Sequence, residues 1–497
     1  MIWRIVQKEL LSHLLTLRFA LGGLCCLGLI ASSAYVLTRQ FEGRLEAHRS
    51  AVTDYEGRLQ AVKVYSELGQ AVRPEAHRPP GPLSILCGGV EGGLGDYVVF
   101  GHGYVPFEAA SSGSDNPYLG IFSSVDFVAV FQVVLSLLAL LFAYDAVSGE
   151  QEDGTLKLTL AGAVPRSSVL LGKYAGALLA LSLPLLVSLG VGLLVATWSE
   201  YVSLSGSDWA RVGSILVGSL FYLSLFYLAG LLCSCAFDRS ASALALCLFA
   251  WVVAVLIYPG AVVFGVDRLG PAPSDQSVKE AARTFIQEID KKTKAFLTSR
   301  GVSDRWQVWS GAAKSTSVRS EDSDSGTGET VKVTVASTKD PDLKLQRDHY
   351  RFMENLRVEI ADQIWQLRRD YLEGGPLRQA RLCRNLSRLS PAAVYGDLSA
   401  VLAGTDLGAH RRFLDQARAY RREVIQYFRD RDAFGSRAWF TDDRGKADVA
   451  GMPRFRWRPE TAGEAVRRGW GDLAILVGWN GALFWVAYVL FAKRSVA

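Results

Sequence analysis

The sequence lacks the motifs with which a chain would carry out chemistry of its own. No GxxxxGK[ST] segment occurs, so the chain has no phosphate-binding loop with which to hydrolyse ATP. HExxH and GxSxG are also absent, and the six histidines are scattered without a Cys/His cluster at metal-ligand spacing. These absences argue against a hydrolase or intramembrane protease. We expect no catalytic residue, cofactor site or metal site in this chain.

The long apolar runs contain few ionisable residues. Asp126 and Asp145 lie at the two ends of one run, away from the level of the bilayer centre. A charge near the centre of a span is the usual mark of an ion path, so a carrier driven by protons or ions is not indicated. If the protein does work, the energy must come from a partner.

What is present is a composition that fits neither a soluble protein nor a bare membrane bundle. The 497 residues are 49% hydrophobic and 21% charged, with a mean hydropathy of +0.17. This balance predicts a membrane protein with a large domain in water. The net charge of +5 is too small for this length to indicate or exclude nucleic acid. We expect protein and membrane-lipid partners and no nucleic acid.

Six apolar runs have about the ~20 residues that a helix needs to cross a bilayer. They are residues 17–37, 126–147, 169–198, 212–236, 241–266 and 473–491. The preceding residues 1–16 place apolar side chains at helical spacing and are typical of a helix lying on the membrane surface. The fold class is therefore an α-helical multi-pass membrane protein with six transmembrane helices and an N-terminal interfacial helix.

The distribution of basic residues predicts which side each loop occupies. Lysine and arginine gather on the side of the two termini, whereas the short loop 199–210 has neither. Basic residues in short loops favour the cytoplasm, so we expect cytoplasmic termini, a cytoplasmic loop at 148–168 and a cytoplasmic tail at 492–497. Segments 38–125 and 267–472 are then extracytoplasmic. In a bacterial cell, this is the inner membrane.

The two extracytoplasmic segments are predicted to be mainly helical. A seven-residue apolar pattern from Phe41 to Val62 continues the first span as a stalk, with His48 as a packed seam residue. Three more helical patterns cover 278–296, 353–371 and 413–427, and 306–309 with 330–335 are typical of short strands around a Ser/Asp/Gly-rich tip at 315–329. The Gly-rich stretch 87–95 is interpreted as a turn-rich loop.

The cysteines and arginines of these segments leave alternatives open. Five of the seven cysteines lie in or beside apolar runs, but Cys87 and Cys383 are both expected outside, where a disulfide between them is one possibility. An arginine-rich tail with interleaved tryptophans could meet anionic lipid headgroups or form a solvated basic face. Its arginines are Arg429, Arg431, Arg437, Arg454, Arg456 and Arg458.

The loop between the second and third spans carries an ordered pattern. Two glutamates precede Gly-Thr and a leucine-rich turn, and Pro-Arg and Gly-Lys follow. This pattern resembles the first cytoplasmic loop of the permease subunits of type-2 ATP-binding-cassette exporters. Segments 116–145 and 386–413 are similar to a long-ectodomain branch of that family. The matching loop positions are Glu150, Glu152, Gly154, Thr155, Leu156, Pro165, Arg166, Gly172 and Lys173.

The resemblance implies a mechanism and partners. In that family the loop is a coupling helix that fits a cleft on a separate ATPase subunit, which binds ATP and magnesium. Six spans imply a half-permease, so a second copy or a paralogous permease completes the pathway. The loop residues, including Lys173, would contact the ATPase, although Lys173 could instead be a basic anchor at the membrane surface.

Two other functions remain open at this point. The same ATPase-driven assembly could use its large outer domain to extract a lipid or lipoprotein or to remodel a partner, without solute flux. The lack of polar residues within the spans motivates this idea. Alternatively, the chain could be an ATP-independent membrane receptor or scaffold. The sequence does not name a substrate.

Overall fold

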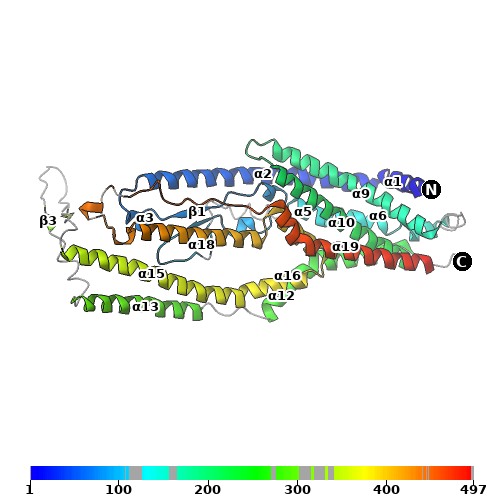
Figure 1. Ribbon diagram of the computed structural model, residues 1–497. Helices are drawn as coiled ribbons and strands as arrows, with labels where there is room; N and C mark the ends of the chain where they lie inside the picture. The colour runs from blue at the N-terminus through cyan, green and yellow to red at the C-terminus, as the bar shows by residue number, and fades with distance from the viewer. Residues whose placement is uncertain are drawn as a thin grey trace, which may run out of the picture.

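The computed structural model is an elongated, almost entirely helical molecule. It describes residues 2–106, 108–110, 126–155, 165–269, 276–301, 315–317, 331–333, 341–438, 440–443, 445 and 447–493. Both termini lie at one end of a helical bundle, and several long helices extend beyond the other end (Figure 1). We call the first the termini end and the protruding part the extension.

Six helices are long and apolar enough to cross a membrane, as the sequence predicts. They are Leu17–Gln60, Phe127–Glu152, Arg166–Thr197, Gly206–Ala236, Ser240–Arg268 and Ala462–Lys493. They make the chain a multi-pass membrane protein. The labels are α2 for Leu17–Gln60, α9 for Arg166–Thr197, α10 for Gly206–Ala236 and α19 for Ala462–Lys493.

The second and fifth spans each contain a π-helical segment. The second consists of α5 (Phe127–Val130), the π segment η3 (Phe131–Leu135), α6 (Ser136–Ala143) and, after a turn, α7 (Ser148–Glu152). The fifth consists of α11 (Ser240–Trp251), the π segment η4 (Val252–Ile257) and α12 (Tyr258–Leu269). Such segments shift the backbone hydrogen bonds by one residue and are frequent at functional sites.

The first span and the stalk form one continuous helix. The short helix α1 (Ile2–Leu14) ends just before Thr16, whose hydroxyl accepts a hydrogen bond from Phe19 N and so caps the 44-residue α2. Along the stalk, Phe41, Tyr55 and Leu59 are buried as the apolar pattern predicts. His48 is half-buried and lies 6.1 Å from the ring of His77. The expected stalk and packed histidine are therefore present.

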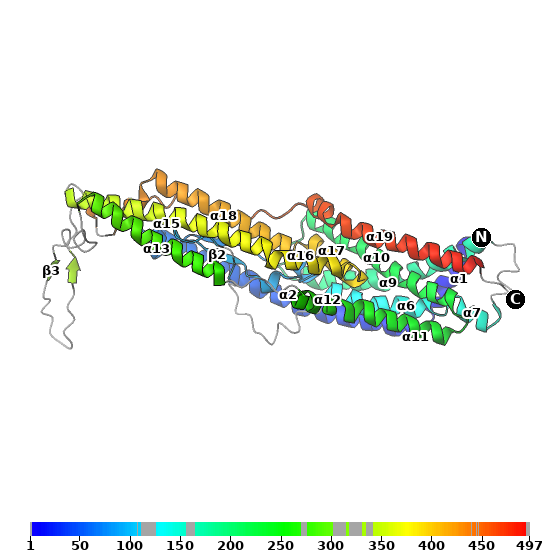
Figure 2. The same ribbon diagram turned by 90° about the horizontal axis from the view of Figure 1, so that it is seen from below.

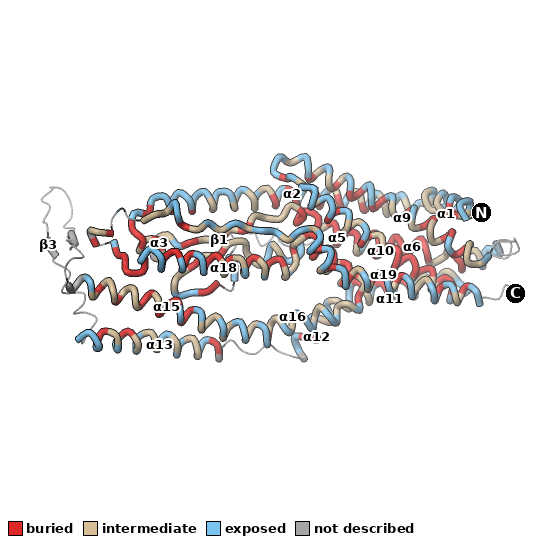
Figure 3. Tube along the Cα trace, viewed as in Figure 1, coloured by how far each residue is buried: buried red, intermediate tan, exposed pale blue. Residues whose placement is uncertain are grey.

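The extension has a core of its own, separate from that of the bundle. Its helices are α3 (Glu67–Gln70), α13 (Gln276–Ser299), α15 (Pro341–Gly374) and α18 (Leu407–Asp430), and α16 (Pro376–Ser387) connects α15 with the fifth span. The three predicted helical patterns fall on α13, α15 and α18. Figure 3 shows buried segments along α13, α15 and α18.

Two small antiparallel sheets accompany the helices. In one, β1 (Glu75–His77) pairs with β2 (Tyr97–Val99), and in the other, β3 (Ser315–Ser317) pairs with β4 (Val331–Val333). Strand β4 falls within the predicted 330–335. Its partner lies inside the run that we expected as the tip, while 306–309 is outside the described residues. Stretch 87–95 contains a 3-10 turn and two left-handed glycines, as expected for a turn-rich loop.

The structure bears on two possibilities that the sequence left open in the extracytoplasmic segments. Cys87 and Cys383 are both free thiols, because Cys87 is buried beside Asp126 and Thr405, away from Cys383 on α16. Arg437 is buried and ion-paired with Glu354, and Arg431 pairs with Asp448. These two arginines therefore do not contribute to a free basic face.

One short helix of the predicted outer domain lies inside the bundle. Helix α17 (Pro391–Ala403) is capped by Ser390 at its start and ends at Gly404, where φ is +74°. Its apolar side chains share a single core with the spans. Gln132 Nε2 donates to Ala392 O at 2.8 Å, and Tyr395 OH lies 2.6 Å from Ser219 Oγ. Residues 391–403 are thus packed among the spans and are not part of the extension (Figure 2).

Candidate functional site

The described part of the predicted coupling loop lies at the termini end, next to α1 and α11 (Figure 2). The loop begins as α7, and its first residues are fixed to the end of α10. The backbone N–H groups of Val147 and Ser148 both donate to Ser234 Oγ, at 2.9 and 3.0 Å. Because Ser234 is fully buried, these hydrogen bonds fix the start of the loop to the end of α10.

A buried ion cluster connects this loop to two other helices. Lys173 near the start of α9 is 3% exposed, and its ammonium lies 2.8 Å from Glu150 Oε1 and 3.1 Å from Glu9 Oε1. Lys8 on α1 approaches the same Glu150 oxygen at 3.8 Å, but its side chain is 68% exposed. A buried charge needs partners of this kind, since burial without them costs several kcal/mol. The cluster therefore holds α1, α7 and α9 together.

Close backbone packing reinforces the contact between α1 and α9. A Cβ atom on Gly172 would lie 2.6 Å from Ile5 Cγ2, and one on Gly176 would lie 2.7 Å from Glu9 Cβ. Two small residues four apart allow helix backbones to approach closely. Gly172 of the loop pattern thus has an internal packing role.

Glu152 connects the loop to the fifth span. Its carboxylate accepts hydrogen bonds from Ser240 N at 3.0 Å and from Ser240 Oγ at 2.7 Å. Ser240 is the first residue of α11, so the carboxylate satisfies an N–H group that has no partner within the helix and opposes the positive end of the helix dipole. A displacement of Glu152 would therefore act directly on α11.

The predicted loop residues separate into buried and accessible groups. Glu152, Gly154, Thr155 and Pro165 are exposed, and Gly154 has a φ of +71°. Arg166 is half-buried and donates to Ala492 O at the end of α19, and Leu156 lies outside the described residues. Lys173 was expected to contact the ATPase or to be a basic anchor at the membrane surface, and this prediction was wrong. Its side chain is enclosed by Glu9 and Glu150.

Sequence reasoning missed several members of this site. Glu9 is the one acidic residue among the first 14, and it lies on the buried side of α1 with Val6. An acid on the apolar stripe of an amphipathic helix signals a buried cation, and this signal was readable. The ion pair between Arg18 and Asp145, at 2.8 Å, joins α2 to the turn before α7 and left no comparable pattern.

Neutral polar side chains also meet inside the bundle, which corrects the view that the spans lack polar groups. Tyr174 OH lies 2.7 Å from Ser224 Oγ, which donates to Asn480 Oδ1 at 2.5 Å. The Asn480 amide donates to the carbonyls of Phe221 and Leu476. These contacts join α9, α10 and α19 by hydrogen bonds, without a charge.

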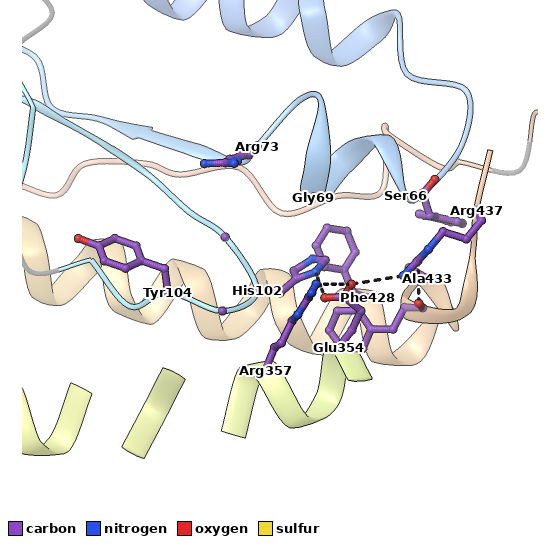
Figure 4. A pocket seen from close by; sticks show the side chains of 14 residues that line it. Ser66, Gly69, Arg73, His102, Tyr104, Glu354, Arg357, Phe428, Ala433 and Arg437 are labelled. Atoms are coloured by element: carbon purple, nitrogen blue, oxygen red, sulfur yellow. Dashed lines mark hydrogen bonds and ion pairs between the residues drawn. The ribbon is translucent and has the colours of Figure 1, made fainter. Parts of the chain in front are cut away.

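The extension contains a cavity that competes as a candidate site. It has a volume of about 290 Å³ and is lined by α3, the loop that follows β2, α15, and the end of α18 with the segment after it (Figure 4). Glu354 lies at its floor, 3.1 Å from His102 Nδ1, 3.1 Å from Arg357 Nη1 and 3.3 Å from Arg437 Nη2. Burial alone would raise the pKa of Glu354, but the hydrogen bond with His102 and the charges of Arg357 and Arg437 lower it below its usual value. The buried charges compensate one another, as in a structural cluster.

Comparison with known proteins identifies the family of the chain. A family model described as "ABC-2 family transporter protein" matches residues 4–496. The chain belongs to the ABC-2 transporter family. The family match extends over both sites, and the loop at the termini end is the one whose pattern resembles the coupling loop of ABC permeases.

Two proteins described as ABC transporter permeases are similar in sequence to part of this chain. One, described as a probable ABC transporter permease protein NosY from Stutzerimonas stutzeri, is 36% identical over 130 residues, which cover 25% of this chain and 45% of the relative. The protein of the same description from Pseudomonas aeruginosa is 37% identical over 130 residues, covering 25% and 46%. The chain thus matches less than half the length of each relative.

Proposed function

We propose that the chain is the permease subunit of an ABC transporter, driven by a separate ATPase that binds ATP and magnesium. The family membership and the permease relatives support this proposal. The observation that carries it is the loop at the termini end. The accessible residues of the loop include Glu152, whose carboxylate is exposed. The buried residues of the loop connect α1, α7 and α9.

In this proposal the termini end faces the cytoplasm and the extension lies outside, in the inner membrane of a bacterial cell. The distribution of basic residues supports this orientation. A second copy or a paralogous permease completes the pathway. The chain itself has no catalytic role, and its substrate follows from neither the fold nor the relatives.

The proposed coupling has a defined route. Closure of two ATPase subunits pushes on residues 150–166, and the push reaches α9 and α1 through Glu150 and Lys173 and reaches α11 through Glu152 and Ser240. The bundle then shifts between two packings, because the ATPase contacts them differently in its two nucleotide states. The exposed residues of the loop would make the subunit contact, and the buried ones would transmit it.

The test compares two substitutions of one contact. Glu152→Arg reverses an exposed charge and removes the cap on α11, whereas Ser240→Ala removes one of the same hydrogen bonds and leaves the loop's charge unchanged. The tagged full chain is purified from its own membranes in mild detergent, and ATP hydrolysis in the eluate is measured. We expect ATPase activity with the wild type and Ser240→Ala, and its loss with Glu152→Arg. A monodisperse wild-type chain without ATPase activity would refute the proposal.

The two alternative functions have less support. An ATP-independent receptor does not account for the ABC-2 family match. The mechanical alternative was motivated by apolar spans, and the hydrogen bonds between Tyr174, Ser224 and Asn480 weaken that motive. Substrate flux into sealed vesicles that contain the complete transporter distinguishes export from mechanical work, since only export requires flux.

A further inference from the structure

Helix α16 exposes leucines and directs arginine toward the protein interior, which is the reverse of the usual arrangement in a water-soluble domain. Leu382 and Leu386 lie four positions apart on one face of α16, and Leu389 follows in the turn after the helix; they are 47%, 47% and 68% exposed. Arg384 on the opposite face and Arg388, the residue that follows the helix, each lie 2.8 Å from an oxygen of Asp472, which is fully buried on α19. A helix of a water-soluble domain buries its leucines and exposes its arginines. The reversed order fits an apolar medium outside α16.

The contacts of α16 place its second half at membrane depth. Tyr258 OH donates to Leu386 O at 3.0 Å, and Ser390 Oγ donates to Ala254 O at 2.6 Å. Ala254 is the middle residue of the span Ser240–Arg268. At ~1.5 Å per residue it lies about 20 Å along the helix from either end. A hydrocarbon core ~30 Å thick therefore includes the level of Leu386 and Leu389.

The exposed leucines continue a lipid-facing surface. On α12, which packs against α16, Val263 and Phe264 are 59% and 63% exposed. Figure 1 and Figure 2 show α16 running from the end of α15 into the bundle beside α12. In a membrane-crossing helix, exposed apolar residues such as these contact the lipid acyl chains. The leucines of α16 extend the same apolar surface.

Two arginines lie where lipid headgroups would be. Helix α16 and the fifth span run antiparallel, with Leu386 beside Tyr258 and Ser390 beside Ala254. Continuing this register along both helices places Arg378 level with Val266, which is two residues from Arg268. Both arginines are exposed, and Arg378 is on the same side of α16 as the leucines. Arginine binds phosphate through several N–H donors in a planar fork. Positive charge therefore borders the apolar surface at its outer edge.

We propose that α16 and α12 form a binding site for an anionic phospholipid in the leaflet on the extension side. The acyl chains lie against Leu382, Leu386 and Leu389, and the phosphate lies between Arg268 and Arg378. The site rests on the membrane-spanning helices and not on the transport proposal. A lipid bound there contacts α16, and the other face of α16 is ion-paired with Asp472 of the sixth span.

The first test measures the medium around α16 by spin-label accessibility. The full chain, with its exposed and half-buried cysteines replaced, is labelled at Leu386→Cys in nanodiscs that contain phosphatidylglycerol. Oxygen should relax this label more than a water-soluble nickel reagent, as it should at the lipid-facing control Phe264→Cys. The opposite order is expected at Asp54→Cys on the stalk, whose side chain is 80% exposed. Nickel dominance at Leu386 would overturn the proposal.

A second copy of the chain is the other surface that could cover these leucines. In that arrangement the label at Leu386 would be inaccessible to both reagents and would show a short dipolar distance to its copy. This outcome would also overturn the proposal. The label in the lipid site is instead accessible to oxygen in a sample diluted with unlabelled chain.

The second test addresses the headgroup. Replacing phosphatidylcholine with phosphatidylglycerol in the nanodisc should raise the Tm of the wild type, and Arg378→Gln with Arg268→Gln should abolish that rise. Arg49→Gln, which removes an exposed arginine from the stalk, is the matched control and should keep it. An equal rise in the double variant would refute the phosphate contact. Purification of each variant as a monodisperse species shows that it has folded.

Discussion

At the scale of single residues, Lys173 is the charge on which the termini end most depends. It is 3% exposed and has two carboxylate partners, so Lys173→Met removes the buried cation that Glu9 and Glu150 share and leaves Glu150 only the exposed Lys8. Breaking a buried pair by removing one partner costs about 3–5 kcal/mol. We expect a large fall in Tm, measured on the purified full chain in detergent.

Lys8 provides the matched control for this prediction. It approaches the same Glu150 oxygen at 3.8 Å, but its side chain is 68% exposed. Exposed ion pairs contribute about 0–1 kcal/mol, so Lys8→Met should leave Tm nearly unchanged. Equal effects of the two substitutions would show that burial does not set the strength of the cluster.

A buried histidine of the extension predicts a dependence of stability on pH. Burial, together with the nearby charges of Arg78 and Arg418, lowers the pKa of His410 to about 4. The unfolded chain, with a pKa of ~6.5, binds the proton more readily than the folded one between these values. Stability is therefore fully present above about pH 6.5 and is lost as the pH falls toward 4.

The measurement is the Tm of the full chain across that window. The wild type should lose stability on acidification, and His410→Gln should lose less, because glutamine does not titrate. The difference between the two Tm curves should vanish above pH 7. Parallel curves down to pH 4 would contradict the assignment of this loss to His410.

Residues of the site were predictable only where their pattern is local. Glu152 and Gly154 belong to a contiguous loop pattern, so the sequence could indicate them. The partners of Lys173 are Glu9 and Glu150, and the first is 164 positions away. A single sequence does not encode which distant side chains meet, which is why Lys173 was expected at a surface although it is enclosed.

At the scale of elements, the packing of α1 on α9 depends on two glycines. Gly172→Ala places a Cβ atom 2.6 Å from Ile5 Cγ2, closer than carbon atoms approach, so α1 must shift. Such overpacking costs about 1–3 kcal/mol. We expect a lower Tm and faster proteolysis of the N-terminal helix.

A glycine on the same helix serves as the control. Around Gly190 of α9 nothing lies within 4 Å of an added Cβ atom. Gly190→Ala should be neutral or slightly stabilising, since alanine favours a helix by about 1 kcal/mol over glycine. If Gly172→Ala were equally harmless, α1 would not be held by close backbone contact.

Elements were predictable where length and periodicity decide them. The six spans and the stalk follow from apolar runs long enough for a bilayer and from a seven-residue pattern. Helix α17 could not be placed in this way, because its 13 residues are too few to span a membrane and a mainly apolar helix of this length is typical of a soluble core. The π segments η3 and η4, against which α17 packs, leave no mark in hydropathy.

At the scale of the whole molecule, the bundle and the extension were predictable as separate bodies, but their connection was not. The composition indicates apolar spans and a large wet domain. The connection consists of α16 and α17, where Asp472 on the sixth span holds Arg384 and Arg388. Asp472 lay at the boundary of the predicted domain, and nothing in its neighbourhood signalled an ion pair across that boundary.

This connection gives a prediction about how the two bodies move together. Asp472→Asn keeps the shape of the side chain but removes the charge that both arginines share, at a cost of about 3–5 kcal/mol for a buried pair. Asp397→Asn is the matched control, because Asp397 also pairs with Arg384, at 3.2 Å, but is 40% exposed. We expect Asp472→Asn to lower Tm strongly and Asp397→Asn to lower it slightly.

The same pair of variants tests whether the ion pair transmits motion. In the assembled complex, spin labels on α15 and on the termini end of α19 should report a distance that changes when an ATP analogue is added. Because α16 would no longer be tied to α19, Asp472→Asn should reduce that change while ATP hydrolysis continues, and Asp397→Asn should preserve it. An undiminished change in Asp472→Asn would mean that the packing of α17 among the spans, and not the charges of α16, carries the motion into the extension.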